Sequence, residues 1–256
     1  MATTYKNIPS VDVTSVRTRL HEAIPITGTI VSATYADNNI KSYTHGMFES
    51  IYDYPYLSSS ANHIFDLTVG VASTDSLYSS IISQQQKKNN LYNQFAQTLV
   101  GYDVTGAIRT FDQDGILGTG SQVSQCMFIP FSRLLAKDEI KKESFSLILG
   151  VSSSRPTSAS FNPFNQRIKI YDSGALNNYR VNSPAGEYGI LYAANSYGTP
   201  MSSTILQAGG AYAKPVGLLY YQAGVAVLNL SATFNVGDPS YTTGTPGGGI
   251  LSSSIA

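Results

Sequence analysis

The pattern of apolar and polar positions is most distinctive between Pro215 and Leu230. Two short apolar runs, residues 216–221 and 225–230, flank the three residues 222–224. Each run has the length and the β-branched and aromatic content of a buried strand, and a short join that contains Gly is typical of a hairpin. A hairpin this apolar is not stable alone in water. We therefore expect other elements to cover both of its faces.

Further strands are predicted from alternation and from runs of β-branched and aromatic residues. Between residues 64 and 71, Phe65, Leu67, Val69 and Val71 alternate with mostly polar neighbours, which is typical of a strand with one buried face. The order of the segments after residue 123 favours an antiparallel β unit of about 100 residues. The other predicted strands lie at residues 26–35, 108–111, 123–131, 145–151, 167–174 and 187–192.

Two helices are predicted. A short one over residues 43–54 would end before Pro55. A long one runs over residues 74–100, with Thr74 or Asp75 available to cap its start and Gly101 available to close its end. At 1.5 Å per residue the long helix would extend for about 40 Å.

The apolar residues of the long helix fall into two groups, with the polar stretch 84–90 between them. A helix with apolar ends and a polar middle is typical of one that bridges two bodies. The pattern also fits a helix on the protein's own surface with a solvated middle, or two helices separated by a break. The two groups are Leu77, Tyr78, Ile81 and Ile82, and Leu91, Tyr92, Phe95, Ala96 and Leu99.

These elements together predict an α+β chain that is mostly β. We expect an antiparallel β-sandwich or barrel-like domain with one long helix and extended termini. Four parts are expected: an extended arm over residues 1–40, a helix-containing part over 41–122, a β domain over 123–234, and a flexible or extended tail over 235–256. The tail is rich in Gly, Ser and Thr.

Composition narrows the function classes. The chain of 256 residues is 42% hydrophobic but only 12% charged, with 18 Tyr and no Trp. Charged residues make up about 25% of ordinary globular proteins. A polar surface with few charges lowers the free-energy cost of burying large areas against partners, which favours a homo-oligomer. The 16 basic and 16 acidic residues give a net charge of +0 without long runs of either sign, so we expect no nucleic-acid partner.

No catalytic signature is found. The three histidines, His21, His45 and His63, lack the spacing of a zinc motif; His45 and Glu49 would share a helix face only as a single pair. The sequence contains no nucleophile elbow, phosphate loop or dinucleotide-binding glycine motif. Asp53 and Asp66 could in principle form a carboxylate pair for glycoside hydrolysis, but nothing in the sequence places them together. We expect no enzymatic activity, no catalytic residue and no cofactor.

Two further features have simple structural interpretations. Asp112-x-Asp114-Gly115 resembles the start of a calcium loop but lacks the third oxygen ligand and the closing Glu, so we expect an Asp-capped turn and no metal. Cys126, the one cysteine, lies in an apolar run and is expected to be buried and inert. The N-terminus has no apolar signal segment and no stretch reaches membrane-spanning length, so synthesis in a cytoplasm and no membrane partner are expected.

Three short motifs resemble a module of structural proteins from large tailed bacteriophages. In that module a proline-bearing strand precedes an Ile-Lys-Pro-Gly-Ser-Phe turn, and a Val-Gly-x-Ile-Tyr-Tyr-x-x-Gly hairpin closes the unit. Here Lys142-Glu143 stands where Pro-Gly is usual, and residues 152–165 and 195–213 are long insertions. The similarity covers residues 123–233. The matching residues are Ile129-Pro130, Ile140-Lys141, Ser144-Phe145, Asp172, Gly174, Val216-Gly217, Tyr220-Tyr221 and Gly224.

The resemblance implies a non-enzymatic virion subunit, made in the host bacterial cytoplasm, that forms a ring or connector in the tail, neck or baseplate. Its partners would be copies of itself and other virion proteins. Two alternatives stay open: a receptor-binding or fibre-associated adhesin that uses Tyr-rich loops to bind glycan, and a capsid decoration protein. The candidate interface residues are Leu77, Ile81, Lys88, Leu91, Tyr92, Phe95, Tyr197, Tyr212, Tyr220 and Tyr221.

Overall fold

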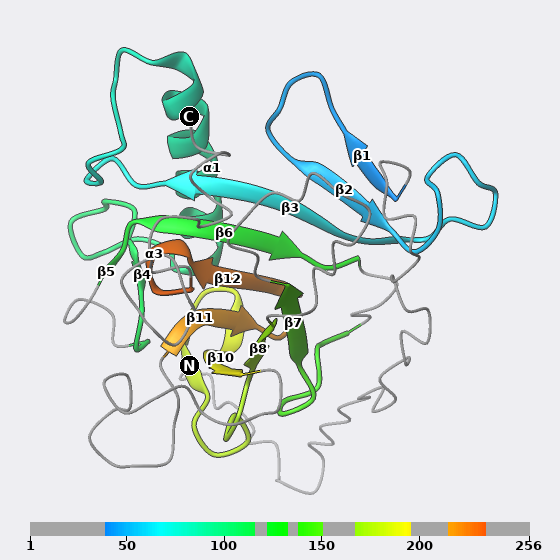
Figure 1. Cartoon of the computed structure of the whole chain (residues 1–256). Coiled ribbons are helices and arrows are strands. Elements are labelled where there is room, and N and C mark those ends of the chain that lie inside the picture. Colours follow the sequence, from blue (N-terminus) through cyan, green and yellow to red (C-terminus); the bar gives the residue numbers. More distant parts are fainter. Residues whose placement is uncertain (1–38, 116–121, 133–137, 151–166, 196–214, 234–256) are drawn as a thin grey trace, which may run out of the picture.

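The computed structural model describes residues 39–115, 122–132, 138–150, 167–195 and 215–233. Most of the predicted arm and all of the predicted tail therefore lie outside the described residues, as does the strand expected over residues 26–35. Within the described ranges the chain is mostly β, with one large antiparallel sheet and one long helix (Figure 1). This confirms the predicted fold class.

Among the strands in the described ranges, ten form the large sheet, and two, β4 and β5, form a separate pair. The order in the large sheet is β1-β2-β3-β6-β12-β11-β10-β8-β7, with β9 on β10. Because β3 pairs with β6, a single sheet runs through both predicted parts 41–122 and 123–234. The strands are β1 (Ile40–Ser42), β2 (Glu49–Tyr52), β3 (His63–Val71), β4 (Phe111–Asp112), β5 (Gln122–Val123), β6 (Gln125–Pro130), β7 (Ser146–Gly150), β8 (Arg167–Tyr171), β9 (Arg180–Ser183), β10 (Gly186–Asn195), β11 (Pro215–Tyr220) and β12 (Val225–Asn229).

The predicted hairpin lies at the centre of this sheet as β11 and β12. Its connection is four residues long, one more than predicted, because the N–H of Tyr221 bonds to the carbonyl of Glu187 on β10 instead of to β12. Gly224 closes the turn with a φ of 68°, and its N–H donates to the carbonyl of Tyr220 at 2.9 Å. That positive φ is the reason for Gly at this position.

Both faces of the hairpin are covered, as the sequence predicted. Tyr220 and Tyr221 point to opposite faces and are both fully buried. One face packs against the helix and β4–β5, and the other against the segment that leads into β7. The helix-side cluster includes Tyr92, Ala96, Leu99, Phe111, Phe128, Tyr188, Tyr220 and Val227, and the opposite cluster includes Ile129, Ile170, Leu191, Val216, Leu219, Tyr221, Ala226 and Leu228.

The long helix, α1 (Ser83–Leu99), is shorter than the predicted 74–100. The prediction was wrong at its start because Asp75 uses its side chain in a turn: its carboxylate accepts from the N–H of Leu77 at 2.8 Å and from the side chains of Ser124 and Gln125. Ser79 competes with helix formation in the same way, since its hydroxyl accepts from the N–H of Ile81. Within the part of the chain that the structure describes, no side chain caps the start of the helix.

The other end of α1 lies where it was predicted. Gly101 has a φ of 81°, and its N–H bonds to the carbonyl of Ala96 at 2.9 Å, as in a left-handed helix end. The helix lies against β3, and Gly70 on that strand permits the approach. A Cβ at Gly70 would lie 2.9 Å from the backbone of Tyr92, so any side chain there would displace the helix.

The short helix predicted over residues 43–54 is absent from the structure, which places a turn and β2 there. The chain reverses at Gly46, which has a φ of 62° and bonds through its N–H to the carbonyl of Tyr43. Pairing of β2 with β3 then supplies the backbone partners that a helix would have supplied internally. His45 and Glu49 therefore do not share a helix face.

The sheet is strongly curved. Phe145, just before β7, packs edge-on against Phe131, just after β6, with ring centroids 5.7 Å apart. Four strands separate β6 from β7 in the sheet order, so these residues meet only because the sheet bends. In Figure 1, β7 accordingly runs steeply across the direction of β6. Among the described strands the path ends at β1 and β7, so the predicted sandwich or barrel closure stays a prediction.

Candidate functional site

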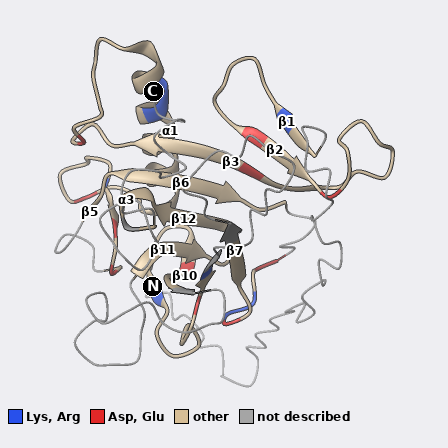
Figure 2. Ribbon diagram, in the orientation of Figure 1, with Lys and Arg blue, Asp and Glu red and all other residues tan. Residues whose placement is uncertain are grey.

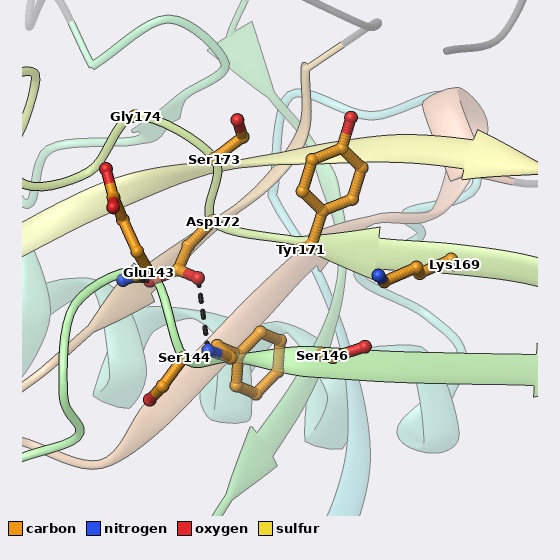
Figure 3. A pocket seen from close by; sticks show the side chains of 9 residues that line it. Glu143, Ser144, Ser146, Lys169, Tyr171, Asp172, Ser173 and Gly174 are labelled. Carbon is orange, nitrogen blue, oxygen red and sulfur yellow. Dashed lines mark hydrogen bonds between the residues drawn. The ribbon is translucent and has the colours of Figure 1, made fainter. Parts of the chain in front are cut away.

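The three motifs that were identified in the sequence meet at the side chain of Asp172, directly after β8. Figure 3 shows this side chain beside the turn that precedes β7. The carboxylate accepts hydrogen bonds from the backbone N–H of Glu143 at 2.8 Å and of Phe145 at 3.1 Å. The hydroxyl of Tyr221 donates to the same carboxylate at 3.2 Å. One buried acid thus joins the turn before β7, the end of β8 and the central hairpin.

The turn at residues 141–144 explains the motif's usual Pro-Gly pair. Glu143 has a φ of 62°, and the N–H of Ser144 donates to the carbonyl of Lys141 at 3.2 Å. A positive φ at the third residue of such a turn defines type II, in which Pro is favoured at the second position and Gly at the third. The chain therefore keeps the turn type with Lys142 and Glu143 in those two positions.

Lys142 stands where the motif usually has proline, and its side chain makes contacts that a proline could not make. Its ammonium forms an ion pair with Glu187, and it lies 4.6 Å from the ring centroid of Tyr179 and 5.3 Å from that of Tyr221. Burial keeps the pair out of water, so the interaction is screened less than a surface ion pair. A proline at this position would remove these contacts.

A pocket of about 330 Å³ lies beside the turn. Its only buried acid, Asp172, has a pKa raised to about 6 by burial, even though its hydrogen bonds favour the charged form. Because both oxygens of this carboxylate already accept hydrogen bonds, its role is structural. The pocket is lined by Glu143, Ser144, Phe145, Ser146, Lys169, Tyr171, Asp172, Ser173 and Gly174 (Figure 3).

The predicted interface residues divide into surface and core. Leu77 and Ile81 are exposed, and Ile81 at 91% exposure has almost no contact with the rest of the chain. Lys88 and Leu91 are half-buried on α1. Phe95 is half-buried and stacks on Phe128, with ring centroids 4.2 Å apart.

Three of the predicted interface residues are core residues. Tyr92, Tyr220 and Tyr221 are buried inside the folded chain and present no surface in this structure. The hydroxyl of Tyr92 donates to the carbonyl of Val123 at 2.7 Å, which holds β5 against α1. Tyr197 and Tyr212 lie outside the described residues.

The segment 73–82 and the first half of α1 project from the sheet at the top of Figure 1. Exposed apolar side chains gather just before the helix, at Leu77, Ile81 and Ile82. The only charges on α1 are Lys87 and Lys88. Figure 2 shows the positions of Lys, Arg, Asp and Glu scattered over the other described parts of the chain. We call residues 73–82 the apolar projection.

A second exposed apolar site was not identified from the sequence. The loop between β2 and β3 carries Leu57, which is 87% exposed, and Tyr54. Asp53 closes the neck of this loop, since its carboxylate accepts from both the backbone N–H and the side-chain amide of Asn62. The sequence Tyr54-Pro55-Tyr56 could have predicted this exposed turn, because proline favours turns.

The residues that the sequence offered for catalysis, Asp53 and Asp66, bond to other residues and not to each other. Asp53 bonds to Asn62, whereas Asp66 accepts from Ser50 and lies 2.8 Å from the Nε2 atom of His63, so the two acids belong to separate networks. Cys126 is buried, and burial raises the pKa of its thiol well above the ordinary value. In the described ranges, no group of three or more His, Cys, Asp and Glu side chains is placed to hold a metal ion.

Comparisons with protein-family models, with curated proteins and with solved structures found no match to this chain. Within the described ranges, no helix combines the length and the apolar character needed to cross a membrane.

Proposed function

We propose that this protein is a non-enzymatic structural subunit of a tailed-phage virion, where it forms an oligomeric ring or connector in the tail, neck or baseplate. Copies of the chain and other virion proteins are its partners, and the virion is its final location. The observation that carries the proposal is the apolar projection, which displays Leu77, Ile81 and Ile82 on a surface with few charges.

Burial of the exposed apolar side chains of the projection against a partner would be energetically favourable. Burial of one large aliphatic side chain contributes about 1.5 to 3 kcal/mol. Ile81 and Ile82 are adjacent, so a partner that covers one can cover the other with little additional ordering of the chain. Neighbouring polar but uncharged residues, such as Gln84 and Gln86, have a lower desolvation penalty than charged ones.

The junction at Asp172 supports the phage context. The three motifs of the resemblance are far apart in the sequence, yet Asp172 bonds directly to the turn of the first and to Tyr221 of the third. Motif residues that make one buried network specify a common fold. The resemblance therefore rests on interacting residues rather than on isolated short matches.

Light scattering over a range of protein concentrations tests the proposal. We expect the wild-type chain to multimerise and a variant with Ile81→Ser and Ile82→Ser to shift towards monomer. Val104→Ser is the matched control, because Val104 is 99% exposed but lies in another loop. A wild-type chain that stays monomeric at all concentrations and binds no other virion protein would overturn the proposal.

A further inference from the structure

The pocket beside the turn at residues 141–144 has the properties of a ligand site. Its volume of about 330 Å³ lies within the range of small-molecule pockets, about 300 to 1,000 Å³. Three of the side chains that line it, Ser144, Ser146 and Ser173, are exposed, so the pocket opens to solvent. Asp172 forms part of the wall, and its hydrogen bonds to the turn hold that wall in place. The pocket is therefore preformed in the folded chain.

The sheet places a serine, a lysine and a tyrosine on one side of this pocket. Strands β7 and β8 pair so that Ser146 lies opposite Tyr171. Lys169 comes two residues before Tyr171 on β8, and alternate residues of a strand point to the same face. Ile170 between them points to the other face and is fully buried. Figure 3 shows the side chains of Ser146, Lys169 and Tyr171 around the pocket.

The ammonium of Lys169 can bind a negatively charged group. It lies 5.6 Å from the ring centroid of Tyr171, near the limit of about 6 Å for contact between a cation and a ring, so this contact is weak. The ion pairs found in the described ranges do not include Lys169. The side chain of Glu143 lies at the opposite end of the pocket, near Gly174 (Figure 3). The pocket thus has a positive end and a negative end, with Tyr171 between them.

Each part of this arrangement matches a part of a sugar acid. The ring of Tyr171 is half-buried, and the electron-rich face of an aromatic ring attracts the slightly positive C–H hydrogens of a pyranose. Serine hydroxyls both donate and accept hydrogen bonds, as the hydroxyl groups of a sugar do. A carboxylate on the sugar would accept a charge-assisted hydrogen bond from Lys169. A purely apolar ligand would instead leave these polar groups without partners.

We propose that this pocket binds a saccharide that carries a carboxylate, with the sugar ring packed against Tyr171 and the carboxylate at Lys169. Ser146 and Ser173 bond to hydroxyl groups of the sugar, and Glu143 accepts from a hydroxyl at the far end. A single uronic acid has about 13 non-hydrogen atoms, which limits its affinity to a Kd of about 1 mM. The site does not depend on the proposed function, because none of these residues lies in the apolar projection.

Saturation-transfer NMR of the full chain with glucuronic acid tests the site, with glucose as the neutral comparison. Glucuronic acid should bind at least about 10-fold more tightly than glucose, the factor expected from one hydrogen bond to a charged group. Lys169→Gln should remove this difference and leave glucose binding unchanged. Lys41→Gln is the matched control, because Lys41 is also half-buried and lies 5.1 Å from the ring centroid of Tyr43, but on β1 at the other end of the sheet order. It should leave the binding of both sugars unchanged.

A second variant and a second ligand separate sugar binding from simple attraction of an anion. Tyr171→Leu keeps an apolar side chain but removes the aromatic face, so it should weaken the binding of both sugars; circular dichroism checks that it folds. Acetate should bind more weakly than glucuronic acid. Equal affinities for acetate and glucuronic acid would overturn the proposal, as would unchanged glucuronic acid binding in Lys169→Gln or the absence of glucuronic acid binding to the wild type. Lys169→Gln decides the proposal even if Tyr171→Leu fails to fold.

Discussion

The central hairpin and the apolar projection are built from the same kinds of residue but have opposite environments. Every residue of β11 and β12 is buried, and both faces are covered within the chain. In the projection, Leu77, Ile81 and Ile82 are exposed. Hydrophobicity alone therefore does not separate core residues from exposed ones.

The hairpin and the projection differ in burial because their backbone groups find hydrogen-bond partners in different places. The hairpin strands each have two neighbours in the sheet, so their side chains are held between two layers. The projection is made of turns that Asp75 and Ser79 stabilise locally, and these turns carry the apolar side chains away from the sheet. The body thus provides stability, whereas the projection exposes apolar side chains that we propose are buried against another molecule.

The largest expected effect tests this division directly. Leu228→Ala should lower the free energy of unfolding by about 2 to 5 kcal/mol, because it leaves a cavity in a fully buried cluster. Ile81→Ala should change it by less than about 0.5 kcal/mol in the monomer. Urea denaturation at low protein concentration measures both. A loss above about 1 kcal/mol for Ile81→Ala would mean that the projection is part of the core.

Two acids with similar hydrogen bonds extend the comparison. Asp172 is buried and accepts from two backbone N–H groups and Tyr221, whereas Asp103 is exposed and accepts from the N–H groups of Thr105 and Ala107 and from the Thr105 hydroxyl. Asp172→Ala should cost about 2 to 4 kcal/mol, because it leaves buried donors unsatisfied. Asp103→Ala should cost clearly less, since water replaces its bonds. Equal losses in chemical denaturation would contradict this.

The pH dependence of these acids should have opposite signs. Burial raises the pKa of Asp172 from 3.8 to about 6, so its contribution is fully present below pH 3.8 and is lost as pH rises through about 6. Hydrogen bonds from the Thr105 hydroxyl and the backbone lower the pKa of Asp103. The stability contributed by Asp103 is therefore present above pH 3.8 and is lost as pH falls below it.

Unfolding free energies at pH 4.5 and pH 7 measure the Asp172 contribution. Between these values the wild type should lose on the order of 1 to 3 kcal/mol more than Asp172→Asn. Asp112 titrates in the same direction, but it is present in both proteins and cancels in the difference. The same pH-dependent loss in both proteins would show that the Asp172 carboxyl does not titrate in this range.

Local sequence patterns correctly predicted those helices and strands whose hydrogen bonds follow the regular pattern of a sheet or a helix end. The hairpin, β3 and the end of α1 were expected from alternation, from short apolar runs and from Gly101. The start of α1 was not predicted correctly. The carboxylate of Asp75 accepts hydrogen bonds from the side chains of Ser124 and Gln125, about fifty residues further along the chain, and a local sequence pattern does not reveal such contacts. Residues 43–54 could not be assigned either, since their pairing with β3 overrides helical spacing.

The candidate site was predictable only in part. The resemblance marked Asp172, Phe145 and Tyr221, but nothing in the sequence indicated that one carboxylate joins them. The Asp112–Asp114 spacing was interpreted as an Asp-capped turn, and the side chain of Asp112 accepts from the N–H of Asp114 at 3.0 Å. What could not be predicted is the burial of Asp112, which depends on how the sheet and α1 enclose the loop.

The smallest effect concerns the turn that holds Glu143 at a φ of 62°. A left-handed conformation costs a residue with a Cβ about 1 to 2 kcal/mol, and glycine avoids most of this at the expense of greater freedom in the unfolded chain. The side chain of Glu143 offsets little, because its hydrogen bond from the N–H of Leu176 is long, at 3.4 Å. We therefore expect Glu143→Gly to stabilise the chain by about 0.5 to 1 kcal/mol.

Lys141→Gly is the matched control for this prediction, since Lys141 lies in the same turn, is exposed, and does not have a positive φ. It should destabilise the chain by about 0.5 to 1 kcal/mol, because glycine adds unfolded-state freedom there without relieving strain. Opposite signs in thermal or urea unfolding would show that Glu143 occupies a left-handed position that Gly would fill with less strain. If both variants destabilise the chain equally, Glu143 bears no backbone strain, and the junction at Asp172 is stabilised by its hydrogen bonds without opposition from the turn.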